Sequence, residues 1–204
     1  MLLKYYYTTP LEDWVHTLYE RNGIYSTEDL DEEIIADSLN ILLSNSESES
    51  HYIVTDFFNM IVVDSRLSYG EQREVFFHEL CHVLRHSGRQ TMMPNAFREL
   101  QEAQTKNFQL YATMPFSMIR NLVLPNYETE IIAFLSDRFK VSYNLAALRL
   151  EQIKRRVFQS KLDNNIRSLE EKRTRKADPS NWSTETKLLL QTAVERKLVK
   201  EGAF

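Results

Sequence analysis

Apolar residues recur every three or four positions along much of the chain, most clearly near its start. The first stripe of this kind is typical of an amphipathic helix and comprises Leu11, Trp14, Val15, Leu18 and Tyr19. Gly23 ends that segment. The same spacing, with capping residues and prolines at the boundaries, predicts further helices over residues 27–39, 71–85, 95–112, 128–138, 143–156 and 183–197.

Two short runs of β-branched and aromatic residues interrupt the helical pattern. Residues 51–55 and 59–63 are strand candidates, and the short segment between them can turn one strand into the other. The polar run at 44–50 is interpreted as a loop. Together these patterns predict an α+β fold, with a small antiparallel sheet beside a helical core.

Composition narrows the class of protein. A chain of 204 residues, 43% of them apolar, can bury a sizeable core, but its longest apolar runs, at 60–63 and 131–135, are far too short to span a bilayer. A single cysteine, Cys81, excludes a disulfide framework. No export signal precedes the first helix, so we expect a cytoplasmic protein without a membrane partner.

Charge is distributed unevenly along the chain. Residues 1–150 carry a formal charge of −9 and residues 151–204 carry +5, within a total of −4. The acidic part argues against direct binding of duplex DNA, which needs clustered Lys and Arg. The basic part has two interpretations, a contact with nucleic acid or a solvated helical face, and the second is favoured.

A metal-binding pattern lies inside the helix predicted over residues 71–85. The chain there reads His78-Glu79-Leu80-Cys81-His82, and two histidines four residues apart lie on one helical face, so their ring nitrogens can bind one ion. Glu79 can take a proton from a water bound to that ion, as a general base does. The alternative interpretation is a helix with two incidental histidines and a salt-bridging glutamate.

A catalytic metal site of this type needs a third protein ligand and an open fourth position. No histidine follows His86, and His86 itself lies about 12 Å along the helix axis from His78, too far to share the ion. The third ligand is then a carboxylate. Glu99 and Glu102 both lie on the next predicted helix, three residues apart, and their spacing does not choose between them. Cys81 is interpreted as a small buried residue.

The segment around this motif resembles the ImmA/IrrE family of metallopeptidases. That family follows its metal-binding helix with the pattern E-x-x-A-N-x-F-A-x-x-L-L-M-P, and Glu102, Phe108 and Met114-Pro115 fall at the matching intervals here. The resemblance therefore implies that Glu102 is the third ligand. Departures such as Cys81 for the usual glycine, or Thr105-Lys106 for Ala-Asn, remove no ligand.

The resemblance also implies a domain organisation and an activity. A zincin-like metallopeptidase domain is expected over residues 1–157, followed by a C-terminal helical extension at 158–204. The expected cofactor is Zn²⁺, held by His78, His82 and Glu102, with Glu79 as the catalytic base. The expected activity is site-specific cleavage of a helix-turn-helix repressor, which would derepress phage, mobile-element or stress genes.

Two other classes of function remain as alternatives. The first is a regulatory protein that keeps the metal site but acts by binding a repressor or DNA without proteolysis. The second is a metal-stabilised structural domain, for which a closed site with four ligands is expected. Glu79 favours the enzyme, because neither alternative needs a general base.

Two further patterns have structural interpretations. The helix pair predicted over 128–138 and 143–156 faintly resembles a helix-turn-helix, but its second helix offers few base-reading side chains, chiefly Asn144 and Arg149. Packing inside the domain is therefore favoured for that pair. The cluster Tyr5-Tyr6-Tyr7 is either a binding surface or the half-buried edge of a strand.

Overall fold

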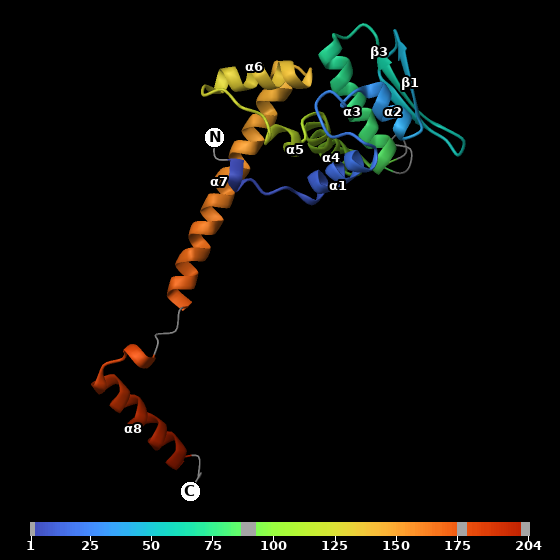
Figure 1. Ribbon diagram of the computed structural model, residues 1–204. Helices are drawn as coiled ribbons and strands as arrows, with labels where there is room; N and C mark the ends of the chain where they lie inside the picture. Colours follow the sequence, from blue (N-terminus) through green and yellow to red (C-terminus); the bar gives the residue numbers. More distant parts are fainter. Residues whose placement is uncertain (1–2, 87–92, 175–178, 201–204) are drawn as a thin grey trace. The chain divides into compact units, whose positions relative to one another are not determined.

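The computed structural model describes residues 3–86, 93–174 and 179–200 (Figure 1). The chain divides into two compact units, Met1–Ser160 and Lys161–Phe204. Along the chain the elements are η1 (Leu3–Tyr5), α1 (Pro10–Arg21), α2 (Glu32–Ser38), β1 (Ile41–Ser46), β2 (His51–Val54), β3 (Asn59–Asp64), α3 (Tyr69–Arg85), α4 (Asn95–Thr113), α5 (Phe116–Ile119), α6 (Glu128–Phe139), α7 (Tyr143–Thr174), η3 (Pro179–Asn181) and α8 (Thr184–Lys200).

The α+β class is confirmed, but the sheet is mixed rather than antiparallel. β2 pairs with β3 in the predicted antiparallel hairpin, and β1 pairs with β3 in parallel, which gives the order β1-β3-β2. β1 includes residues 44–46, which the sequence pattern placed in a loop. The polar residues of β1 gave no strand signal, because an edge strand with exposed positions needs few apolar side chains. The central strand β3, in contrast, is buried along its last four residues.

α3 is the helix around which the first unit is built. Glu71 accepts hydrogen bonds from the backbone N–H and the hydroxyl of Ser68, which stabilises the first turn. The apolar side of α3 is buried through Phe76, Phe77 and Leu80. The helix packs against β2 and β3 on the sheet and against α4. The histidine face of α3 is thereby placed between the sheet and α4.

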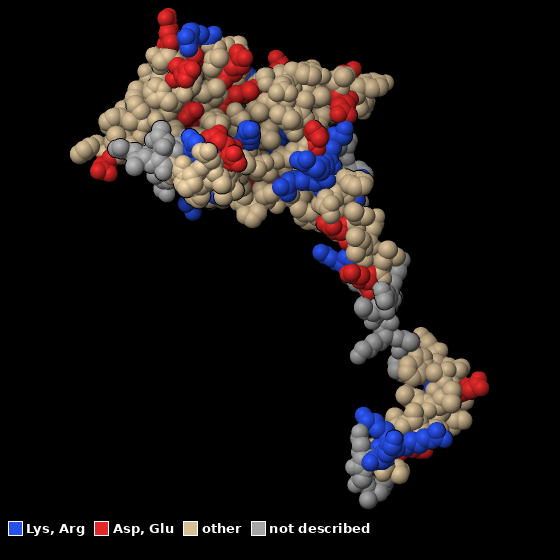
Figure 2. Space-filling model, turned by 180° about the vertical axis from the view of Figure 1, so that it is seen from behind, with Lys and Arg blue, Asp and Glu red and all other residues tan. Residues whose placement is uncertain are grey.

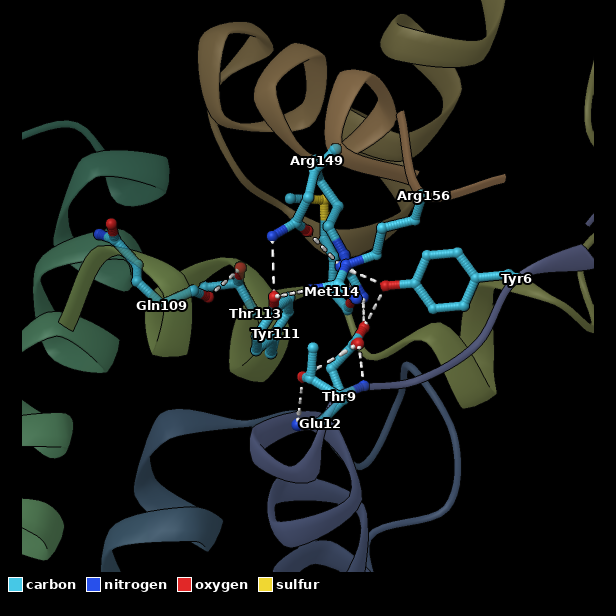
Figure 3. Close-up of polar contacts among 10 residues, drawn as sticks. Tyr6, Thr9, Glu12, Gln109, Tyr111, Thr113, Met114, Arg149 and Arg156 are labelled. Carbon is cyan, nitrogen blue, oxygen red and sulfur yellow. Dashed lines mark hydrogen bonds and ion pairs between the residues drawn. The ribbon is translucent and has the colours of Figure 1, made fainter. Parts of the chain in front are cut away.

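A buried polar network joins α1, the end of α4 and α7 (Figure 3). The Arg149 side chain is fully buried, and its Nη2 lies 2.9 Å from Glu12 Oε1. Arg149 Nε donates to the Met114 carbonyl, and Nη1 donates to Gln152 Oε1 and the Tyr6 hydroxyl. The buried polar atoms of Arg149, Glu12 and Gln152 in this network therefore have partners, as burial requires. The packing interpretation of the 128–156 helix pair is confirmed, since Arg149 cannot reach a DNA base.

The predicted start of α2 and the predicted place of the tyrosine cluster need correction. α2 begins at Glu32 instead of residue 27, because Asp29 binds the backbone N–H groups of Tyr25 and Ser26 in a turn and Asp31 caps the helix. The Tyr5–Tyr7 cluster is not a strand edge, because Tyr6 is buried after η1.

α7 continues to Thr174 rather than ending near residue 156, so much of the segment between the last two predicted helices is itself helical. Residues 175–178 of that segment lie outside the described residues. The structure places the boundary between its two units at residues 160 and 161, inside α7. Within the described ranges, every helix is too short or too polar to cross a membrane.

Candidate metal centre

Three of the predicted ligands lie together between α3 and α4. The Nε2 atoms of His78 and His82 are 3.2 Å apart. Each oxygen of Glu102 lies 3.4 Å from one of these two nitrogens. The two histidines project from successive turns of α3, and the packing of α4 against α3 brings the carboxylate to them. The structure thus forms a compact triangle from two imidazole nitrogens and one carboxylate.

The dimensions of this triangle fit a tetrahedral zinc ion. With zinc–ligand bonds of about 2.0–2.1 Å, two ligands of a tetrahedron are separated by about 3.3 Å. The 3.2 Å between the two histidine nitrogens matches that edge length, and each nitrogen has one oxygen of the Glu102 carboxylate at 3.4 Å, a different oxygen for each. Two imidazoles and one carboxylate are also a donor set that zinc commonly takes in catalytic sites. The residues present therefore fit the implied metal.

His82 is oriented by a hydrogen-bonded chain behind it. Its Nδ1 lies 2.9 Å from Nδ1 of His86, and Nε2 of His86 lies 3.3 Å from Oε1 of Gln104 on α4. Because the Gln104 oxygen can only accept, His86 carries its proton on Nε2 and accepts at Nδ1 from His82. This tautomer puts the lone pair of His82 Nε2 on the side that faces Glu102 and His78. His86 is therefore a neighbour that positions a ligand, and it does not belong to the triangle.

Burial keeps the histidine ligands in the form that binds a metal. It lowers the pKa of His82 to about 4, with the nearby His78 adding to the effect. Burial also lowers the pKa of His78. Neutral imidazoles are the required ligand form, so both side chains are ready to bind a cation near neutral pH.

Glu79 lies beside the triangle without being part of it. Burial raises the pKa of Glu79 to about 7, and the negative charge of Glu102 adds to this rise. A carboxyl group with such a pKa can both take up and release a proton near neutral pH. A divalent cation bound next to it would favour the ionised form. Glu79 is thus the candidate general base of this site.

Tyr52 on β2 is a site neighbour that sequence reasoning missed. Its ring stacks on His82 with the centroids 5.1 Å apart and the planes 12° from parallel. Burial raises the pKa of its hydroxyl, as do the charges of Glu79 and Glu102, which places the phenol near both carboxylates. No local pattern identifies this residue, because only the hairpin register brings position 52 over α3.

The remaining candidates are placed away from the triangle. Glu99 is exposed one turn before Glu102 on α4, and both residues line a cleft of about 690 Å³. Cys81 is fully buried, which agrees with its interpretation as a small core residue. Neither residue belongs to the group of mutually close ligand atoms, which comprises His78, His82 and Glu102.

Comparison with known proteins identifies the family of this chain. Residues 30–151 match the Peptidase M78 family model, described as the IrrE N-terminal-like domain. The chain is 36% identical over 150 residues to the phage-like element PBSX protein XkdA of Bacillus subtilis (strain 168), which covers 74% of this chain and 76% of that protein. It is 34% identical over 154 residues to the uncharacterized protein YqaB of the same organism, covering 76% of this chain and 90% of YqaB. The match includes every residue of the metal centre, and the chain belongs to the ImmA/IrrE family of metallopeptidases.

Proposed function

We propose that this protein is a zinc-dependent, site-specific endopeptidase that cleaves a helix-turn-helix transcriptional repressor. The observation that carries the proposal is the position of Glu79 beside a triangle of ligands with zinc dimensions. A metal site that only stabilises a fold, or only supports binding, needs no such base. The likeness to a protein of a phage-like element supports a target among the regulators of such elements.

The metal-binding residues are His78, His82 and Glu102, and zinc bound there would supply a Lewis acid that polarises the scissile carbonyl and acidifies a water. Glu79 takes the proton of the attacking water at its carboxylate. It then delivers that proton to the nitrogen of the leaving amine, so the same carboxyl group acts first as base and then as acid.

The substrate has a place to lie next to these groups. Among the described strands β2 lies at the edge of the sheet and pairs with β3, and its Tyr52 stacks on His82. An extended polypeptide can add to such an edge through main-chain hydrogen bonds. Added there, a segment of the substrate would lie alongside β2, the strand whose Tyr52 is close enough to Glu79 to feel its charge. Main-chain pairing is indifferent to sequence, so it holds the scissile bond without selecting the target.

The test is to incubate purified full-length protein with candidate helix-turn-helix repressors and to identify products by mass spectrometry, with and without a chelator. Glu79→Gln should retain zinc, measured by elemental analysis, but cleave at least about 10³-fold more slowly, since only the acid–base group is lost. Glu99→Gln, the same change at an exposed position on α4, is the matched control and should cleave normally. A Glu79→Gln protein that still inactivates a repressor would support the alternative, a regulatory protein that acts by binding.

A further inference from the structure

The first unit has a second hollow, separate from the metal triangle, where α1, α3, α4 and α7 meet. Its volume is about 890 Å³, and its lining includes three arginines, Arg85, Arg155 and Arg156. Trp14 and Tyr111 provide aromatic walls. We call this hollow the arginine groove. None of the lining residues is acidic.

The charged groups of the arginine groove are not neutralised by the protein. Among the described residues, no carboxylate forms an ion pair with Arg85, Arg155 or Arg156. The guanidinium group of Arg85 lies over the Trp14 ring, 5.0 Å from its centroid, which leaves its N–H groups available. Figure 2 shows Lys and Arg side chains gathered where α7 leaves the first unit.

The wall of the groove adds a further hydrogen-bond donor. The Tyr111 hydroxyl accepts from Gln152 Nε2 at 3.0 Å and from Arg156 Nη2 at 3.4 Å. With both acceptor positions used, the hydrogen of this hydroxyl is left to donate. Gln152 is held in turn by Arg149, so the donors sit on a rigid, buried network (Figure 3). A cationic groove with a preorganised donor is built for an anion.

We propose that the arginine groove binds an acidic segment of the protein that this enzyme cleaves; the inference rests on the proposed function. Guanidinium groups bind carboxylates with paired N–H donors, so aspartate and glutamate side chains fit this lining. Arg85 follows His82 by three residues on α3, which is about 4.5 Å along the helix axis. The same helix therefore contributes residues both to the metal centre and to the arginine groove.

The charge of the chain argues against two other occupants. α8 has a formal charge of +2 and does not complement three arginines. A long nucleic acid extends its phosphates well beyond the groove, and the formal charge of −9 on residues 1–150 disfavours such a ligand. A short acidic segment can confine its charges to the groove.

Fluorescence anisotropy with fluorescein-labelled hexaglutamate tests this proposal. The zinc-loaded, full-length Glu79→Gln protein is used, so that binding is measured without cleavage. Replacing the three arginines together, as Arg85→Gln/Arg155→Gln/Arg156→Gln, should weaken binding at least tenfold, and added salt should weaken binding to the parent protein. A matched control removes three positive charges elsewhere on the first unit, as Lys4→Gln/Arg21→Gln/Arg120→Gln, and should bind within about threefold of the parent.

Equal binding by the two triple variants would overturn the proposal, as would the absence of binding to the parent protein. If hexathymidylate binds more tightly than hexaglutamate, and the triple arginine variant no longer binds it, the occupant is a nucleic acid instead. The proposed function is tested separately, by measuring repressor cleavage by the wild-type chain. If hexaglutamate binds through the arginines but no repressor is cleaved, the groove binds acidic peptides and the proposed peptidase activity is wrong.

Discussion

The buried ion pair between Arg149 and Glu12 should be one of the largest single contributions to the stability of the first unit. Replacing Arg149 with methionine keeps the length of the aliphatic stem but leaves the Glu12 carboxylate, 5% exposed, without its cation. It also removes the donors to the Met114 carbonyl and to Gln152. Loss of one member of a buried pair costs roughly 3–5 kcal/mol, because the remaining charge stays desolvated.

The effect is measurable by urea unfolding followed by circular dichroism, with the free energy of unfolding extrapolated to water. For a chain of this size, a loss of roughly 3–5 kcal/mol lowers the melting temperature by about 6–20 °C. The matched control is Arg138→Met, which breaks an ion pair with Glu28 whose two side chains are 43% and 62% exposed. Exposed pairs contribute less than about 1 kcal/mol, so this variant should melt near the wild type.

A second variant separates the charge from the packing. Glu12→Gln in the Arg149→Met background removes the unpaired charge while keeping a side chain that can cap α1. We expect it to regain a measurable part of the lost free energy. The reasoning is refuted if Arg149→Met costs no more than Arg138→Met, since the Glu12 carboxylate would then be hydrated in spite of its burial.

The other predictions concern the metal centre and the core beside it. The protein should bind about one equivalent of zinc, and alanine at any one of the three ligand positions should abolish zinc binding. Glu99→Ala should leave zinc binding intact. Loss of zinc in Glu99→Ala, with zinc retained in Glu102→Ala, would show that Glu99 is the third ligand. His86→Ala should keep the stoichiometry but weaken zinc affinity about 10–100-fold in a chelator competition, because the tautomer of His82 is no longer set by His86 and Gln104. Burial raises the pKa of the Cys81 thiol to about 11, so at pH 8 only about one thiol in 10³ is ionised. Iodoacetamide should therefore label Cys81 only after denaturation, and rapid labelling of the native protein would contradict this.

The elements that depend on neighbouring residues could be predicted from the sequence. α1 begins at Pro10 with a capping box, and α3 presents two histidines one turn apart, so both the helices and the ligand pair followed from nearby residues. The third ligand needed the family resemblance, because Glu99 and Glu102 are equivalent by spacing alone. Features that depend on distant pairing could not be predicted.

β1 and Tyr52 show where local reasoning ends. The polar half of β1 forms a strand because Asn45 and Ser46 pair with β3, whose buried residues supply the apolar side. Tyr52 reaches His82 through the register of a hairpin that the sequence does not state. Gln104 sets the tautomer of His86 from another helix, and an exposed glutamine on α4 carries no sign of that role.

The metal centre and the buried network span very different lengths of chain. His78 and Glu102 are 24 residues apart within two helices that contact each other, whereas Arg149 and Glu12 are separated by 137 residues. Closing the shorter loop costs less entropy, and during synthesis the α3–α4 pair is complete before Arg149 has been added. A growing or prematurely ended chain can therefore contain all three ligand residues while the carboxylate of Glu12 still has no cation. Metal binding by such a chain would show that α3 and α4 have met, and it would not show that Arg149 has closed the network with Glu12.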